Sequence, residues 1–202
     1  MATINTSLER LITNLSKLPT IGRKTALRLA AFLIKENNEF AKELADSIIA
    51  IKEKILLCKK CGNYSETELC NICSAENRDS AIICVVEEPF DILNIEKTGQ
   101  FNGLYHTLSG VISIQKGVMP EDLKIEKLLE RIKTENIKEI IIALNPTQEG
   151  ETTALYLKQK ILETAAKNIK ITRLATGLPL GSIIEYTDKD TLSGALANRI
   201  DY

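Results

Sequence analysis

Tryptophan is absent from this chain, histidine occurs once, and aromatic residues make up 4% of its 202 positions. So few aromatic rings argue against a surface that stacks successive nucleotide bases. The single histidine, His106, has no evident catalytic partner, and we interpret it as structural. No apolar run reaches the roughly 18–20 residues that a membrane-spanning helix requires. The chain also begins without the basic and then apolar pattern of a signal peptide, so we expect a cytosolic protein whose thiols stay reduced.

A charge excess of one sign is lacking as well. The chain has 26 Lys and Arg against 27 Asp and Glu, for a net charge of −1. This balance argues against a protein that coats nucleic acid through bulk positive charge. The balance is uneven along the chain, because residues 1–57 carry nine cations and six anions, whereas residues 81–202 carry fourteen cations and seventeen anions. We therefore expect a modestly basic N-terminal part and a modestly acidic C-terminal part.

Apolar residues make up 44% of the chain, which is enough for a proper core. Helical spacing of these residues predicts helices before Pro19 and over about 23–34, 38–57, 124–135, 150–167 and 190–200. Continuous apolar runs at 81–86, 139–144 and 169–174 predict buried strands of a parallel sheet, and a short strand is expected in the tail. The fold class is therefore α/β. We divide the chain into a helical region (1–57), a cysteine module (58–73), an α/β domain (81–176) and a C-terminal strand-helix tail (177–202).

Four cysteines are spaced in two Cys-x₂-Cys pairs, Cys58/Cys61 and Cys70/Cys73. Two such pairs complete a tetrahedron of thiolates around Zn²⁺. A redox motif would use one pair, and disulfides are disfavoured in a reducing compartment. Because four protein ligands leave no open position, we predict one structural zinc ion per chain. Lys59 and Lys60 can offset the negative charge of this site, and the fifth cysteine, Cys84, is expected to be buried in a strand.

The segment from Leu18 to Ala26, LPTIGRKTA, joins two predicted helices through a tight turn. The first backbone N–H groups of the second helix form an anion site, to which a DNA phosphate is suited. Arg23, Lys24 and Arg28 place three cations there. The pattern resembles the helix-hairpin-helix of DNA-binding proteins that do not read sequence, although an ordinary hairpin with a solvated basic face remains the alternative. Thr20 stands where that motif usually has glycine, so we expect a distorted turn.

Acidic residues follow the predicted strands, where ligands of open parallel sheets bind. Glu87 follows the first strand, and the second is followed by Asn145-Pro146-Thr147 and then by Glu149 and Glu151. The arrangement resembles the Toprim domain of topoisomerases and primases, whose Asp-x-Asp is replaced here by Asn145-x-Thr147. Convergent carboxylates would suit Mg²⁺, but the replacement removes two ligand charges that phosphoryl chemistry needs. We therefore expect a Toprim fold without Toprim catalysis. The acids are then a docking patch for a basic partner, a weak Mg²⁺ site or solvated charge at helix starts.

The tail sequence Ile183-Ile184-Glu185-Tyr186 resembles a Walker B strand. Since the chain has no Walker A loop, this strand cannot form part of an ATPase. We expect it to pack against a neighbouring domain or subunit.

The order of these motifs, a basic hairpin, a four-cysteine module, a Toprim-like domain and the tail GLPLGSIIEY, resembles the bacterial RecR family of recombination mediators along the whole chain. The resemblance implies a non-enzymatic, homotetrameric DNA clamp of the RecF repair pathway. It would bind single-stranded, gapped and duplex DNA in the nucleoid, and it would act with RecO and RecF to help load RecA. It also implies that Lys24 and Arg28 contact DNA, that the four cysteines bind zinc, and that Glu87, Glu149 and Glu151 are Toprim acids. The alternatives are a Mg²⁺-dependent Toprim nuclease or strand transferase, and an adaptor that does not touch DNA.

Overall fold

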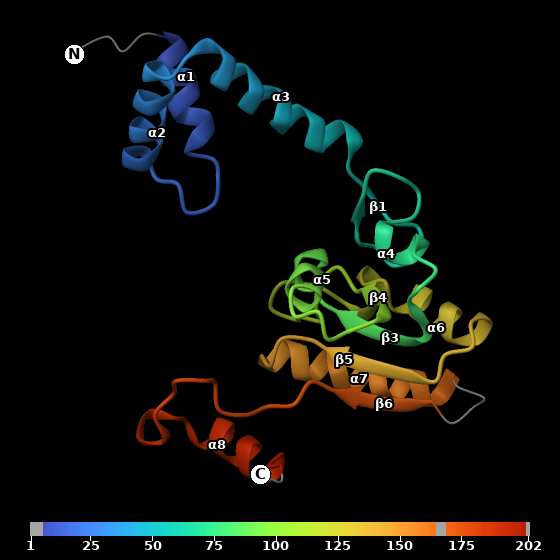
Figure 1. The fold of residues 1–202 in the computed structure, drawn as a ribbon. Helices are drawn as coiled ribbons and strands as arrows, with labels where there is room; N and C mark the ends of the chain where they lie inside the picture. The colour runs from blue at the N-terminus through green and yellow to red at the C-terminus, as the bar shows by residue number, and fades with distance from the viewer. Residues whose placement is uncertain (1–5, 165–168, 201–202) are drawn as a thin grey trace. The chain divides into compact units, whose positions relative to one another are not determined.

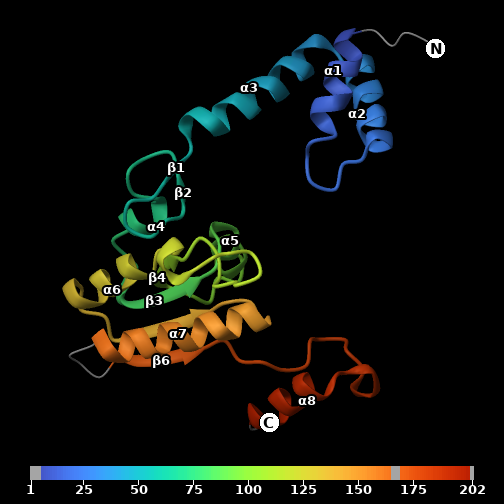
Figure 2. The same cartoon turned by 180° about the vertical axis from the view of Figure 1, so that it is seen from behind.

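The computed structural model describes residues 6–164 and 169–200, which divide into two compact units with the boundary between Ile55 and Leu56. The first unit contains three helices: α1 (Thr6–Leu15), α2 (Arg23–Lys35) and α3 (Asn38–Lys54). Asn37 ends the connection between α2 and α3, since its side chain accepts a 2.8 Å hydrogen bond from the N–H of Phe40 and so caps α3. Figures 1 and 2 show α1 and α2 as a hairpin.

The second unit begins with the cysteine module. Its two-residue strands, β1 (Leu56–Leu57) and β2 (Tyr64–Ser65), pair antiparallel, and the short helix α4 (Asn71–Ser74) follows. Such a small module has too few apolar side chains for a core of its own. Its stability therefore depends on its cysteines and on the neighbouring sheet.

A four-stranded parallel sheet forms the centre of the second unit, in the order β4-β3-β5-β6. The strands are β3 (Asp79–Val86), β4 (Gly103–Thr107), β5 (Glu139–Ala143) and β6 (Lys170–Arg173). The helices are α5 (Pro89–Glu96), α6 (Ile125–Thr134) and α7 (Gln148–Thr164), with a 3₁₀ turn at Pro120–Asp122. In Figure 1, α7 runs along β5 and β6.

The central strand β3 is covered on both faces. Ile83 and Val85 belong to the larger core, which includes residues of α6 and α7, whereas Cys84 and Val86 pack on the other face with Ile92 of α5. This alternation explains the continuous apolar run, since each successive side chain enters one of two cores. The buried position expected for Cys84 is confirmed, and burial raises the pKa of its thiol to about 12.

The expected α/β class, with its hairpin, cysteine module and parallel sheet, is confirmed, but two details differ. The strand β4 and the helix α5 were not predicted. The strand expected in the tail is instead a 3₁₀ turn at Ile184–Tyr186, followed by α8 (Lys189–Ala197). No strand of the described residues pairs with this turn, and a bend closed by the Ser182 N–H on the Pro179 carbonyl (3.1 Å) precedes it. In the described part of the chain, no helix combines the length and apolar character needed to cross a bilayer.

Candidate functional site

The turn between α1 and α2 keeps the conformation that a glycine would favour. Thr20 has a φ of 67°, in the left-handed region, and the N–H of Ile21 closes the turn on the carbonyl of Leu18 at 3.1 Å. A β-branched residue is strained there by about 1–2 kcal/mol. At Thr20 the consequence of the missing glycine is thus backbone strain; whether the turn as a whole is distorted stays a prediction.

The two helices of the hairpin meet through small residues. Ile12 of α1 is fully buried against Ala26 and Ala30 of α2, and both alanines are also fully buried. Alanine allows the two helix backbones to approach closely, which fixes the direction in which the exposed face of α2 points. The hairpin is thus a rigid support for the charged residues of α2.

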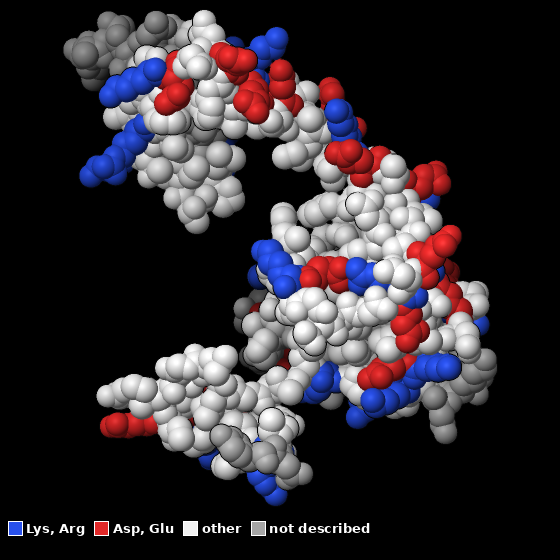
Figure 3. All heavy atoms as spheres, viewed as in Figure 1, with Lys and Arg blue, Asp and Glu red and all other residues white. Residues whose placement is uncertain are grey.

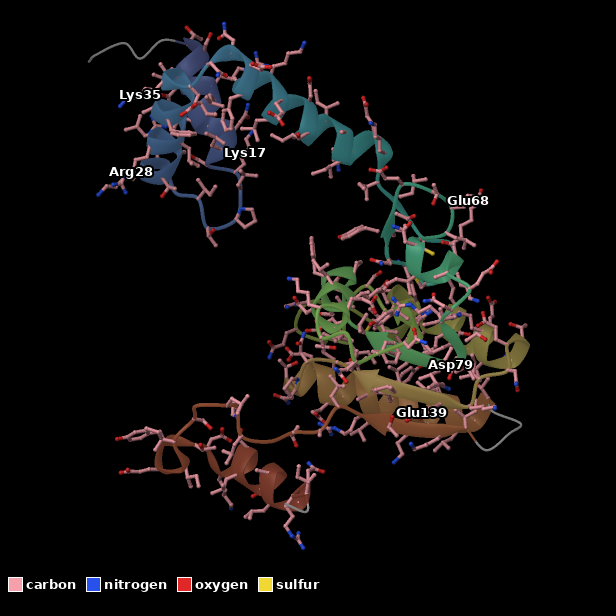
Figure 4. The ribbon with its side chains drawn as sticks, in the orientation of Figure 1. Lys17, Arg28, Lys35, Glu68, Asp79 and Glu139 are labelled. Carbon is pink, nitrogen blue, oxygen red and sulfur yellow. The ribbon has the colours of Figure 1, made fainter. Side chains whose placement is uncertain are left out.

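The three predicted cations of α2 differ in their surroundings. Arg23 forms a 2.6 Å ion pair with Glu9 of α1, whereas Lys24 and Arg28 are exposed and have no ion pair within the described residues. Lys24 and Arg28 are four residues apart and share a face of the helix. Figure 4 shows Arg28 extending away from α2, and on the face seen in Figure 3 acidic side chains gather instead along α3. Of these three cations, Lys24 and Arg28 are thus the ones whose charge is available to a ligand.

The first turn of α2 is open. Gly22 is its N-cap and makes no side-chain cap hydrogen bond, and a Cβ placed on Gly22 would meet nothing within 4 Å. The first N–H groups of α2 therefore have no side-chain cap from Gly22, and Lys24 is one of the residues that carry them. Unpaired N–H groups and the helix dipole favour an anion at such a position.

The four predicted zinc ligands come together. The Sγ atoms of Cys58, Cys61, Cys70 and Cys73 all lie within 4.8 Å of one another, and those of Cys61 and Cys70 are 3.6 Å apart. A tetrahedral Zn²⁺ with bonds of about 2.3 Å needs sulfur atoms about 3.8 Å apart. The hydrogen bond between Cys61 and Cys70 raises the pKa of Cys61 and lowers that of Cys70, so the free thiols share their protons, and a bound cation is needed for all four to be ionised together.

Backbone groups orient two of these sulfur atoms. The N–H of Asn63 donates to Cys61 Sγ at 3.4 Å, and the N–H of Cys70 donates to Cys58 Sγ at 3.3 Å. All four ligand positions come from cysteines, so no position is open to water or substrate. The four cysteines form a structural zinc site.

The zinc module is attached to the end of β4. The carbonyl of Cys61 accepts two hydrogen bonds from Thr107, one from its N–H at 2.8 Å and one from its hydroxyl at 3.1 Å. Gly62 has a φ of 79°, and a Cβ at this position would lie 2.3 Å from Thr107 Oγ1. Glycine is therefore required here both for its backbone conformation and for the close approach of the sheet.

At the edge of the sheet, Glu87 follows β3 and Asn145 follows β5, and these two strands are neighbours. The side-chain amide of Asn145 donates a 2.7 Å hydrogen bond to Glu87 Oε2. A Toprim enzyme needs a cation between its acids, whereas here an amide nitrogen satisfies the carboxylate directly. Thr147, at the second replaced position, accepts the N–H of Gly150 at 3.1 Å and caps α7.

The acids at this edge have separate partners. Glu151 forms hydrogen bonds of 2.8 and 3.1 Å with Arg173, and Glu88 caps α5 together with Asp91. Burial and the neighbouring charges of Glu87 and Asp91 raise the pKa of Glu88. In residues 6–164 and 169–200, the four cysteines are the one group of three or more metal-ligating side chains close enough to share an ion. The carboxylates at this edge do not form such a group within the described residues.

His106 is fully enclosed. Its Nε2 lies 2.8 Å from the carbonyl of Lys124, and burial lowers its pKa to about 4. The guanidinium of Arg131 is 3.5 Å from the other ring nitrogen and donates to the carbonyl of Tyr105 at 2.8 Å. These contacts join β4 to α6 and support a structural role.

Three curated proteins named Recombination protein RecR are similar to this chain along almost its whole length. The protein of Rubrobacter xylanophilus is 46% identical over 199 residues, which cover 98% of each chain. That of Bifidobacterium adolescentis is 47% identical over 193 residues, covering 96% of this chain and 95% of its own. That of Chloroherpeton thalassium is 47% identical over 199 residues, covering 96% of each. The chain belongs to the RecR family.

Family models divide this RecR-family chain into four matched segments. They describe a RecR helix-hairpin-helix (residues 8–52), a RecR zinc-finger domain of the four-cysteine type (55–75), a Toprim domain (81–175) and a RecR C-terminal segment (177–200). The RecR zinc-finger match includes all four clustered cysteines. The partner of Glu87 was not predicted from the sequence. The signal for it is the amide at Asn145, which is a hydrogen-bond donor where an enzyme of this fold has an acid.

Proposed function

We propose that this chain is a DNA-binding recombination mediator that acts in DNA repair, with RecO and RecF, to help load RecA on gapped or single-stranded DNA. The observation that carries the proposal is the rigid hairpin that holds Lys24 and Arg28 exposed and free of ion pairs, within the described residues, beside an open helix start. Membership of a family whose proteins are named for recombination supports it.

The hairpin contacts DNA through phosphate rather than through bases. Lys24 and Arg28 supply charge, and the first N–H groups of α2 supply hydrogen bonds; neither distinguishes one base pair from another. Arg23 contributes less, because Glu9 neutralises part of its charge. Two cations from the hairpin face of each chain give weak binding, so several copies or a partner must act together.

The chain acts without catalysis at its Toprim domain. The hydrogen bond between Asn145 and Glu87 occupies the carboxylate that a Mg²⁺ ion would need, and Glu151 is paired with Arg173. Activation of a phosphoryl group requires a cation held by several charged ligands. Glu87, Glu149 and Glu151 instead form a docking patch for a basic surface of a protein partner.

The working form is a homotetramer that surrounds DNA. Unpaired apolar surface in both units supports assembly: Phe40, Leu44, Ile48 and Ile51 are exposed along α3, and Leu180, Ile184 and Tyr186 are exposed in the tail. Exposed apolar stripes of this length are typical of surfaces that a second chain covers. In this form, DNA binding belongs to residues 1–57, zinc binding to 58–73, the Toprim domain to 81–176 and assembly to 177–202.

Binding to a labelled gapped duplex, measured by fluorescence anisotropy at several salt concentrations, tests this function. Lys24→Ala with Arg28→Ala should weaken binding at least tenfold, while Lys35→Ala, at the other end of α2, should change it less than twofold. Equal affinity of the double variant and the unaltered protein would exclude the hairpin as the DNA surface. Cleavage or strand transfer with Mg²⁺ that is lost in Glu87→Gln would show an enzyme instead.

A further inference from the structure

The ammonium group of Lys124 is buried without a partner. Its Nζ has no hydrogen-bond acceptor, and the residue forms no ion pair in the part of the chain that the structure describes. Its backbone is held firmly, because its N–H donates to the carbonyl of Leu108 at 3.0 Å and its own carbonyl lies 2.8 Å from His106 Nε2. An unpaired buried charge is strongly unfavourable, so negative charge must lie nearby.

The ammonium lies against the turn that carries a zinc ligand. A Cβ placed on Gly62 would be 3.1 Å from Lys124 Nζ, and Gly62 directly follows the ligand Cys61. A small cavity of about 160 Å³ separates the zinc turn from α6. Its lining includes four lysines, Lys59, Lys60, Lys124 and Lys127.

The charges of the other three lysines are balanced by carboxylates or solvated by water, without the zinc site. Lys59 is paired with Glu68, and Lys60 Nζ lies 3.5 Å from a carboxylate oxygen of Glu135. Lys127 is exposed, so water solvates it. Lys124 alone among the four has a buried ammonium with no carboxylate within ion-pair distance in the described residues, although the charge of Glu88 acts on it from further away.

We propose that Lys124 is the counter-charge of the zinc–cysteine cluster. Four thiolates around one Zn²⁺ carry a net charge of −2, and this charge lies beside the one ammonium of the cavity that lacks a partner. The sequence pattern assigned this role to Lys59 and Lys60, but both have carboxylate partners. The zinc site is therefore completed by a side chain from the start of α6, more than fifty positions along the chain.

Zinc affinity of the full-length protein, measured by competition with a chromophoric chelator, tests the proposal. Lys124→Met keeps the length of the side chain and removes its charge, and it should weaken zinc binding about tenfold or more, as loss of groups around a ligand set usually does. Lys127→Met, in the same cavity, should change the affinity less than twofold. Lys124→Arg should recover most of the affinity.

Stability with and without zinc separates charge from packing. Zinc-loaded Lys124→Met should melt at a lower temperature than the zinc-loaded unaltered protein, whereas the two metal-free proteins should melt at the same temperature or in the reverse order. An equal loss in both forms would show that Lys124 acts only through packing and would overturn the proposal. So would unchanged zinc affinity together with weaker DNA binding, because the cavity would then serve a phosphate group.

Discussion

The side-chain amide of Asn145 donates a 2.7 Å hydrogen bond to Glu87, across the ends of two neighbouring parallel strands. The amide N–H thus gives Glu87 a hydrogen-bond donor at the position where a Toprim enzyme holds a cation. At this edge of the sheet Glu87 therefore has a hydrogen-bond partner from the protein itself.

Replacement of Asn145 by an acid should show how much this hydrogen bond contributes to stability. Asn145→Asp would place two carboxyl groups at hydrogen-bond distance, and we expect a loss of about 1–3 kcal/mol in unfolding free energy at pH 8. Repulsion raises the folded-state pKa of one carboxyl above its unfolded value, so the deficit should shrink as the pH falls to 5 and this group binds a proton. Urea unfolding at pH 8 and at pH 5 measures this loss in unfolding free energy. Asn136→Asp, an exposed position with the same change in charge, is the control, and equal effects at both positions would contradict the argument.

Thr20→Gly should stabilise the hairpin unit. Relief of left-handed strain contributes about 1–2 kcal/mol, while the greater freedom of glycine in the unfolded chain costs about 0.5–1 kcal/mol, so we expect a net gain of about 0.5–1 kcal/mol. Thr25→Gly, on the exposed face of α2, also replaces a threonine by glycine but relieves no strain, so it should destabilise the hairpin unit. Urea unfolding followed by helical circular dichroism compares the two. A loss of stability in both variants would mean that Thr20 is not strained.

Zinc content should depend on the clustered cysteines and not on the fifth. The purified protein should hold one zinc per chain by elemental analysis, Cys84→Ala should keep it, and Cys70→Ala should lose most of it. Chelation should lower the melting temperature, since metal binding supplies the folding free energy of the module. A Cys70→Ala protein with full zinc content would refute the assignment of ligands.

His106 should resist protonation. Burial lowers its pKa to about 4, and because the unfolded value is about 6.5, the unfolded chain binds more protons between these values. The contribution of neutral His106 to stability is therefore complete above about pH 6.5 and decreases as the pH falls toward 4, by up to about 3 kcal/mol. As the chain has one histidine, its ring resonance in a proton NMR titration is unambiguous. A midpoint near 6.5 would place the ring in solvent.

The sequence predicted those elements whose stabilising contacts are close in the chain or purely apolar. The strand at 81–86 was recognisable because Ile83 and Cys84 enter two different cores, and the cysteine spacing determined the metal site. The strand β4 was missed because it is stabilised by polar long-range contacts: Tyr105 donates to Glu96 at 2.7 Å, and Thr107 donates to Cys61. The periodic spacing of apolar residues gives no indication of such polar contacts.

Single side chains explain the remaining differences. Thr20 adopts a glycine conformation that the preference of its residue type opposes, because packing of α1 on α2 determines the turn. The partner of Glu87 comes from another strand, fifty-eight positions away. The role proposed for Lys124 depends on a turn in a different module, so no local sequence pattern could indicate it.

The double hydrogen bond from Thr107 to the carbonyl of Cys61 also bears on the order in which the chain folds. The two residues are 46 positions apart, and the module that offers the carbonyl is synthesised first. A module already closed around its metal presents a fixed acceptor to β4 as that strand emerges from the ribosome, whereas an open one leaves the strand end to search over a long loop. Zinc supply during synthesis should thus set the rate at which the sheet is completed.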